Sequence, residues 1–401
     1  MVDFGARDES NSPKDTEKKD KVYNPLHNIC ATSVKIDFTE DEQSEKEFYL
    51  KIYERFCSKP NSTTFDSTKY IPNVELKCLE KFQLDFVPYC LTHCDVPSSG
   101  NGHENILLLS GSDDLIHGYR RSYSFSTVGG DNEKGGDIDN NDKGDSNNLK
   151  TDNCFYEMED NEIMQLFPEF SQSTPSPAIS LSFKYDECDQ VSHRWSAIGC
   201  QDGQLQVFQV DSTKGEVLKV FEDLQFAGIG GIHHARFFNM PTAVETASQL
   251  FNLIVVPSLE RSALYIDITN SEKQLHLDKE TQMLQMSSDF DSVNGCTILD
   301  IDGDGYPEIV LGTYGQELIV YKMSENRNDS RELNSSTSHD LIPNWRVWMR
   351  KSFPYPILAV EGWERDNSSN AYFDLDSAAS ILVVTTIRAI HILQYDKNSL
   401  N

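Results

Sequence analysis

The stretch that decides the fold runs from Asp300 to Tyr321 and reads Asp300-Ile-Asp302-Gly-Asp304-Gly-Tyr-Pro-Glu308-Ile-Val-Leu-Gly312-Thr-Tyr-Gly-Gln-Glu-Leu-Ile-Val-Tyr321. Carboxylates occupy every second position at its start, and two aliphatic runs follow, separated by a Gly-Thr-Tyr-Gly turn. Short aliphatic runs joined by turn residues are typical of a β-hairpin. The stretch therefore predicts an acidic loop that leads directly into two antiparallel strands.

The acidic loop has a pattern that suits a hard divalent cation. Its oxygen-bearing side chains stand at loop positions 1, 3, 5 and 9 and belong to Asp300, Asp302, Asp304 and Glu308. Calcium takes roughly six to eight oxygen ligands, so these four residues predict a calcium site. An EF-hand is excluded, because the glutamate at its last position is replaced here by Leu311. The aspartates can equally build a hydrogen-bonded Asx-type turn without metal, and both interpretations remain open.

Four other segments repeat the same order of aliphatic strand, turn and second strand. They begin at Ile106, Ser196, Leu253 and Ile381. Gly199 lies 57 residues before Val256, which in turn lies 56 residues before Gly312. Such a period, without strong helical patterns, is typical of β-propeller blades. We therefore predict an all-β fold, a β-propeller of six or seven blades that is integrin-repeat-like and carries acidic disordered insertions.

The polar segments set the expected domain boundaries. Residues 45–396 are predicted to form the propeller, and residues 1–44 a disordered or divergent N-terminal segment. Residues 122–162 are rich in Asp, Asn and Gly, and we expect them to be a low-complexity insertion. Residues 324–340 are expected to form a second polar loop.

The charge and hydropathy of the chain limit its partners. The formal net charge is −29, which argues against nucleic acid and anionic membrane surfaces and favours a basic partner surface. The N-terminus has no apolar signal-peptide core, and no apolar run reaches the length of a membrane span. These features predict a soluble intracellular protein with reduced thiols.

Motifs that carry catalysis are missing from the sequence. There is no G-x-S-x-G, P-loop, G-x-G-x-x-G after a strand, or H-E-x-x-H, so we predict a non-enzyme without catalytic residues or a required cofactor. His233 and His234 would point to opposite faces of a strand, which disfavours a shared metal ion. His117 and His391 hold matching places in their repeats and are expected to be packing residues.

Two further clusters have an ordinary structural interpretation. The run Cys90-Leu-Thr-His-Cys94 resembles a metal motif but lacks a second pair, so buried thiols on a strand are favoured. Trp345, Trp348 and Trp363 flank the last repeat, where they can anchor a partner or pack within the blade; packing is favoured.

Seven blocks of the sequence stand out together: Leu84–His93, Leu107–His117, Leu166–Phe170, Ser196–Gly203, Asp291–Val293, Asp300–Leu318 and His391–Gln394. In this order they resemble the kaptin family of propeller subunits of the KICSTOR complex. The resemblance covers roughly residues 45–395. It departs from the family at the N-terminus, where a further blade is not found, and in the last blade, where a second acidic loop is degraded to Glu361–Asp366.

The resemblance implies a scaffold protein. It implies association with other KICSTOR subunits, including a second propeller, recruitment of the GATOR machinery to the lysosomal surface, and restraint of TOR complex 1 when amino acids or glucose are scarce. It also implies, as an alternative, a protein associated with actin in motile or actin-rich cell structures. A calcium-dependent binding module that uses Asp300–Glu308 is a third hypothesis. The expected protein is cytoplasmic, without a membrane span, and is recruited to the lysosomal surface or, in the alternative, to actin-rich cell edges.

Overall fold

The computed structural model describes residues 28–37, 45–57, 74–97, 103–124, 152–172, 174–186, 193–240, 250–268, 281–324, 344–363 and 380–395. The chain divides into two units, and each is described by itself. Unit 1 comprises Met1–Leu108 and His117–Asp160, and unit 2 comprises Leu109–Ile116 and Asn161–Asn401. No helix among the described residues is long and apolar enough to cross a bilayer.

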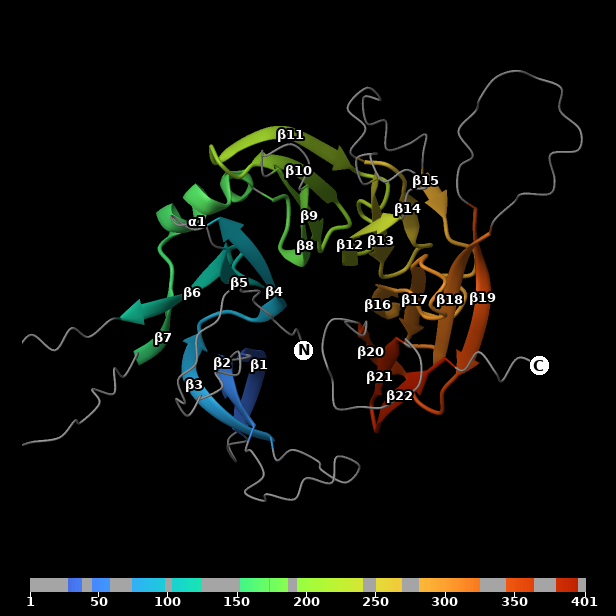
Figure 1. The fold of residues 1–401 in the computed structure, drawn as a ribbon, viewed down its shortest axis with the longest axis horizontal. Helices are drawn as coiled ribbons and strands as arrows, with labels where there is room; N and C mark the ends of the chain where they lie inside the picture. The colour runs from blue at the N-terminus through green and yellow to red at the C-terminus, as the bar shows by residue number, and fades with distance from the viewer. Residues whose placement is uncertain are drawn as a thin grey trace, which may run out of the picture. The chain divides into compact units, whose positions relative to one another are not determined.

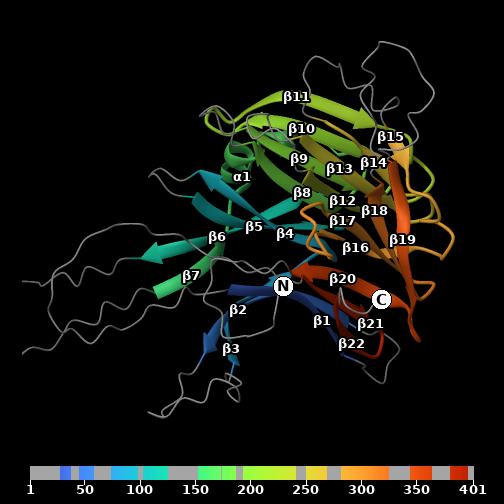
Figure 2. The same cartoon turned by 45° about the vertical axis from the view of Figure 1, so that its right-hand side comes forward.

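Unit 2 contains four consecutive antiparallel sheets, which Figures 1 and 2 show in green to red. The first sheet comprises β8 (Ala178–Asp186), β9 (His193–Cys200), β10 (Leu205–Asp211) and β11 (Glu216–Asp223). The second comprises β12 (Ile232–Met240), β13 (Leu250–Pro257), β14 (Ala263–Tyr265) and β15 (Thr281–Met283). The third comprises β16 (Val293–Leu299), β17 (Glu308–Thr313), β18 (Glu317–Ser324) and β19 (Asn344–Ser352). The fourth comprises β20 (Ile357–Trp363), β21 (Ile381–Thr386) and β22 (Ile390–Gln394).

Burial explains why the middle strands are aliphatic on both faces. All six residues of β17 are buried, and β9 is buried except at its first residue, because each middle strand lies between two neighbouring sheets. The outer strand β11 instead alternates exposed and half-buried residues along its whole length. Apolar clusters fill the space between successive sheets, with Trp195 and Phe251 in the first interface and Trp345 in the second.

The first strands of successive sheets run parallel to each other and are joined by side chains. Ser180 in β8 accepts a hydrogen bond from the amide of Ala235 in β12 at 2.8 Å. His234 Nε2 lies 3.0 Å from the Asn294 carbonyl in β16, and Asn294 Nδ2 donates to the Ile357 carbonyl in β20 at 3.0 Å. These contacts stack four sheets by their inner strands, which is a β-propeller arrangement.

Unit 1 holds the remaining strands. One sheet comprises β1 (Asn28–Asp37), β2 (Glu45–Cys57) and β3 (Val74–Leu84). The other comprises β4 (Pro88–Pro97), β5 (His103–Gly111), whose last residues belong to unit 2, β6 (Ile116–Ser124) and β7 (Asp152–Glu157). A short helix, α1 (Asp160–Leu166), and the 3-10 turn η1 (Pro168–Ser171) lead from β7 to β8.

The all-β propeller prediction is confirmed, but the predicted count of six or seven blades is wrong. Four sheets among the described residues have four strands, and β20–β22, which packs on β16 and β17, makes a fifth blade. The remaining sheet, β1–β3 in unit 1, has three strands. The five hairpins repeated in the sequence supply the middle strands of these five blades, and the higher count added blades for which the sequence holds no such repeat.

The predicted insertions fall only partly on described residues. Residues 125–151 and 325–343 lie outside them, so the acidic insertion and the second polar loop are not confirmed. Two ends of the predicted segments do form regular structure. Strand β7 and the start of α1 lie within 122–162, and β1 lies within the N-terminal segment 1–44.

Candidate functional site

The acidic loop forms the turn between β16 and β17 in the third sheet of unit 2. Both strands are largely buried, and residues 300–307 form the turn that joins them. Strand β18 pairs with β17, with Tyr321 opposite Ile309. The next residue pair in this antiparallel register places Lys322 opposite Glu308, at the base of the loop.

Asp300 organises the backbone of the turn. Its Oδ1 accepts hydrogen bonds from the amides of Gly303 at 2.7 Å and Asp304 at 3.1 Å, and its Oδ2 accepts one from Gly305 at 2.8 Å. Gly303 and Gly305 have φ angles of 68° and 90°, a backbone region that glycine enters without steric cost. The Asx-type turn expected as one alternative is therefore present.

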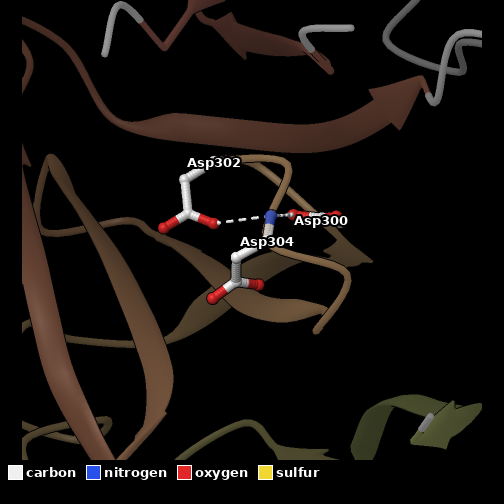
Figure 3. A group of neighbouring side chains, drawn as sticks. All are labelled: Asp300, Asp302 and Asp304. Atoms are coloured by element: carbon white, nitrogen blue, oxygen red, sulfur yellow. Dashed lines mark hydrogen bonds between the residues drawn. The ribbon is translucent and has the colours of Figure 1, made fainter.

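The other carboxylates gather on this turn. Figure 3 shows the amide nitrogen of Asp304 between the carboxylates of Asp300 and Asp302. One oxygen from each of Asp300, Asp302 and Asp304 can be chosen so that all three lie within 4.8 Å of one another. Glu308 is fully buried, and its Oε2 accepts a hydrogen bond from the Ile301 amide at 2.8 Å. The structure thus brings all four predicted residues to one loop.

A lysine lies among these carboxylates. Lys322 Nζ is 2.5 Å from Asp302 Oδ2, 2.6 Å from Asp304 Oδ2 and 3.1 Å from Glu308 Oε1. The ammonium also lies 5.2 Å from the centre of the Trp348 ring, close enough for a cation–π contact. The loop therefore contacts a cation that belongs to the chain itself.

The pKa values reflect this arrangement. Burial lowers the pKa of Lys322, but hydrogen bonds to Asp302, Asp304 and Glu308 outweigh it and hold the pKa above its ordinary value. Burial raises the pKa of Glu308, although the Ile301 amide and Lys322 act in the opposite direction. Lys322 is therefore charged at neutral pH and compensates part of the negative charge of the loop.

The four carboxylates are suitable ligands for a hard cation, but two features of the loop reduce the binding free energy expected for calcium. Both oxygens of Asp300 already accept backbone amides, and Lys322 already contacts Asp302, Asp304 and Glu308. A divalent ion would have to share these carboxylates with Lys322 or displace it. Calcium at this loop stays a prediction, as does the absence of a required cofactor.

Lys322 was not among the residues predicted from the sequence. It stands 20 residues after Asp302 and carries no motif of its own. A signal was nevertheless available, because counting the hairpin register outward from the Gly-Gln-Glu turn places residue 322 beside residue 308. A basic residue at that position indicates an internal partner for an acidic loop.

The four histidines predicted to have no catalytic or metal-binding role all contact neighbouring parts of the fold. His233 Nδ1 lies 3.3 Å from the Val293 carbonyl, and His234 contacts Asn294 instead, so the pair joins β12 to β16. His117 stacks on Phe86 with ring centres 4.2 Å apart, and His391 meets Phe353 edge-on at 5.0 Å. Both of these histidines are the second residue of their strands, β6 and β22. Packing roles agree with these contacts.

The tryptophans and thiols also have distinct settings. Trp345 is buried, Trp348 lies 5.4 Å from the Tyr395 ring, and Trp363 is half exposed. Trp345 and Trp348 therefore pack within the fold. Cys94 is buried in β4 and Cys90 is partly buried, and neither is joined in a disulfide. Among the described residues, only the three aspartates of the loop form a cluster with metal-ligand spacing.

Comparison with known proteins adds independent information. The family described as "KICSTOR complex protein kaptin" matches residues 29–129 and 147–401. The mouse protein named "KICSTOR complex protein kaptin" is 28% identical over 367 residues, which are 90% of this chain and 69% of the mouse protein.

Solved structures with similar folds are distant. The structure of BBS1N in complex with ARL6DN has 8% identity and a TM-score of 0.41, covering 90% of this chain and 78% of that one. A polycomb repressive complex 2 in its basal state has 9% identity and a TM-score of 0.39, covering 78% and 50% of the two chains. Polycomb repressive complex 2 from Chaetomium thermophilum, bound to GSK126, has 11% identity and a TM-score of 0.40, covering 79% and 54%.

Proposed function

This chain belongs to the kaptin family, and from that premise we propose that it is a non-enzymatic scaffold subunit of a KICSTOR-like complex. In this role it joins other subunits, including a second propeller, and the assembly brings the GATOR machinery to the lysosomal surface. There the assembly restrains TOR complex 1 when amino acids or glucose are scarce. The chain itself is then cytoplasmic and reaches the lysosome through its partners.

The observation that carries this proposal is the extent of the family match. It spans both units, from residue 29 to residue 401 with one gap, so it is not confined to a generic propeller repeat. The fold supports the same role, because stacked sheets with short connections present broad, rigid surfaces on which partners can be held. A fold does not by itself fix a function, so the proposal needs a direct test.

Affinity purification of the tagged full-length chain from its own cells tests the proposal, with mass spectrometry of the associated proteins. We expect a second propeller and a large scaffold subunit to be recovered in amounts comparable to the bait. Recovery should persist when actin filaments are depolymerised before lysis. Recovery of actin and its regulators without these subunits would contradict the proposal and favour the actin-associated alternative.

A functional assay complements the purification. Loss of the chain should leave TOR complex 1 substrates phosphorylated after amino-acid withdrawal, whereas wild-type cells lose this phosphorylation. Re-expression of the full chain should restore the response. Unchanged starvation responses in cells without the chain would contradict the regulatory part of the proposal even if the complex forms.

A further inference from the structure

One end of the sheets in unit 2 gathers two kinds of loop. The first strands of the four sheets run parallel to one another, namely β8, β12, β16 and β20. The connections that enter these strands therefore lie at one end of the sheets. The turns between the second and third strands lie at the same end, because neighbouring strands within each sheet are antiparallel. We call this surface the turn face. It comprises the connections 224–231, 284–292 and 353–356 and the turns 201–204, 258–262, 314–316 and 387–389.

Backbone hydrogen bonds fix the turn face. The Gly228 amide donates to the Asp202 carbonyl at 2.7 Å, and the Ser258 amide donates to the Gly231 carbonyl at 2.9 Å. In the third sheet, the Gly315 amide donates to the Phe290 carbonyl at 3.0 Å. The turns 201–204, 258–262 and 314–316 are thus each bonded to a neighbouring connection. Side chains at these loops are therefore held on a preorganised surface, which lowers the entropy cost of binding.

Large apolar side chains project from this surface. They are between 44% and 67% exposed and belong to Leu224, Ile229, Leu259, Tyr314 and Ile387. Leu259 lies over the neighbouring connection, because a Cβ atom added at Gly230 would be 3.5 Å from its Cγ. A single exposed aliphatic side chain is ordinary, but exposed apolar side chains at loop tips in every sheet of unit 2 are not explained by folding. Two of them, Ile229 and Leu259, lie on loops that are bonded to each other.

The opposite ends of the same sheets differ. Two turns are described there, residues 212–215 and 300–307, and neither holds an exposed large apolar side chain. The second of them is the acidic loop, whose carboxylates are engaged by backbone amides and Lys322. Among the described turns of unit 2, exposed apolar tips are thus found on the turn face, and Trp363, the last residue of β20, is an exposed apolar side chain at the opposite end.

Charge narrows the kind of partner. The loops of the turn face carry four acids, which are Asp202, Glu260, Asp289 and Asp291, and two bases, which are Arg261 and Arg388. The chain as a whole has a formal net charge of −29. Apolar anchors surrounded by negative charge favour a surface with apolar recesses bordered by Lys and Arg.

We propose that the turn face is a docking surface for a protein partner of this chemistry, anchored by Ile229 and Leu259. The inference rests on the proposed scaffold function and deepens it, because it assigns the contact to one end of the sheets. Leu224, Tyr314 and Ile387 extend the same surface across the neighbouring sheets. The acidic side chains around them orient the basic partner and accelerate its association.

A matched pair of variants tests this assignment in the full chain. The turn-face variant replaces Ile229 and Leu259 by Ser, and the control replaces Leu218 and Val220 on the outer strand β11, which are 44% and 38% exposed, by Ser. Removing two anchor residues should lower the recovery of at least one KICSTOR subunit about tenfold or more. The control should retain wild-type recovery, and both variants should unfold at the wild-type temperature. Equal recovery with both variants would overturn the docking surface and leave the proposed function intact.

Photo-crosslinking separates failure of the surface from failure of the proposed function. A benzoylphenylalanine at position 259 should crosslink to a peptide that contains Lys or Arg beside apolar residues, and one at position 218 should not. If the wild-type chain recovers no KICSTOR subunit, the proposed function fails. A crosslink from position 259 to one identified protein, weakened by Asp289→Lys, would still support the surface. Equal labelling from both positions would overturn it.

Discussion

Arg194 and Glu169 form an ion pair from which solvent is excluded, with side chains that are 1% and 0% exposed. Arg194 donates to both carboxylate oxygens at 2.9 and 2.8 Å and to the Leu166 carbonyl at 2.9 Å. Ser196 donates to the same carboxylate at 2.6 Å. Arg194 and Ser196 belong to β9, whereas Glu169 lies in η1. The pair therefore fastens the connection from β7 onto the first sheet of unit 2.

Substitution of Arg194 by Met should be strongly destabilising. It leaves the buried Glu169 carboxylate without its cation, and breaking one half of a buried pair costs about 3–5 kcal/mol. Urea unfolding of the purified chain, followed by tryptophan fluorescence, measures the change. Arg120→Met is the matched control, since its partner Glu104 and Arg120 itself are 17% and 32% exposed. We expect that control to cost less than about 1 kcal/mol.

A double variant separates charge from packing at this position. Arg194→Met combined with Glu169→Met removes both charges and should recover much of the lost stability, because apolar groups often replace a buried pair without net cost. A double variant as unstable as Arg194→Met alone would show that the side-chain shapes, rather than the uncompensated carboxylate, cause the loss.

The second prediction concerns Lys322 as the internal cation of the acidic loop. Lys322→Met should destabilise the chain by about 1–3 kcal/mol, because Glu308 is buried and loses its counter-charge. Millimolar calcium should raise the melting temperature of this variant more than that of the wild-type chain. The ion then takes the space of the ammonium, and a ligand bound only by the folded state stabilises it.

Scanning fluorimetry with calcium and with a chelator measures both effects. Lys351→Met, at an exposed residue of β19, controls for the loss of one positive charge. Adding Asp302→Asn and Asp304→Asn to Lys322→Met should abolish the calcium response. A wild-type chain whose melting temperature falls in chelator as far as that of Lys322→Met would contradict the internal-cation interpretation and favour a resident calcium ion.

The third prediction compares two glycines at the interface between the third and fourth sheets. A Cβ atom at Gly312 would lie 2.4 Å from Val360 Cγ2 and 2.6 Å from Ile357 Cγ2, whereas one at Gly295 would lie 2.6 Å from the Val360 backbone nitrogen. Alanine at either position should cost about 1–3 kcal/mol by overpacking. Adding Val360→Ala should partly restore Gly312→Ala, because it removes a clashing methyl group.

The same rescue should fail at Gly295, since the backbone nitrogen of Val360 remains in place. Thermal unfolding of the two single and two double variants, with Val360→Ala alone as the reference, gives the comparison. Equal rescue at both positions would show that the two sheets move apart freely, contrary to the tight stacking described above.

Much of the fold was predictable because the middle strands carry the signal. The pairs β9–β10 and β17–β18 are aliphatic and closed by turns that contain Gly203 or Gly315, so the repeats identified them correctly. The outer strands were harder. Strand β15 has only three residues, and β7 lies in a stretch whose composition resembles its acidic neighbours. Outer strands bury one face at most, so their sequences carry a weaker pattern.

The acidic loop was likewise predictable only in part. The carboxylates follow one another in sequence and were found, but the cation that they contact comes from the neighbouring strand β18. Only the register of β17 and β18 brings Lys322 to Glu308. The turn face was also beyond the sequence argument, because Ile229 and Leu259 are 30 residues apart and read as ordinary loop residues until the sheets are stacked.

The last prediction is a pH dependence at the junction of β12 and β16. Burial, and next the neighbouring Arg236 cation, lower the pKa of His234 to about 3, while the hydrogen bond to the Asn294 carbonyl acts in the opposite direction. A carbonyl can only accept, so Nε2 carries the proton of the neutral ring. His233, Cys296 and Glu361 also lie in this environment, and Glu361 pairs with Arg236 at 3.6 Å.

The sign of the effect follows from the two states of His234. Below about pH 6.5 the unfolded chain binds a proton at this histidine, whereas the folded chain does not until about pH 3. Stability should therefore be complete above pH 6.5 and fall with pH between these limits, by up to about 1.4 kcal/mol for each pH unit. His234→Gln keeps a donor for Asn294 and removes the titration, so its stability should depend less on pH in this window. His93, whose pKa burial also lowers, preserves part of the slope. A slope of wild-type size in His234→Gln would show that His234 is not the group that titrates.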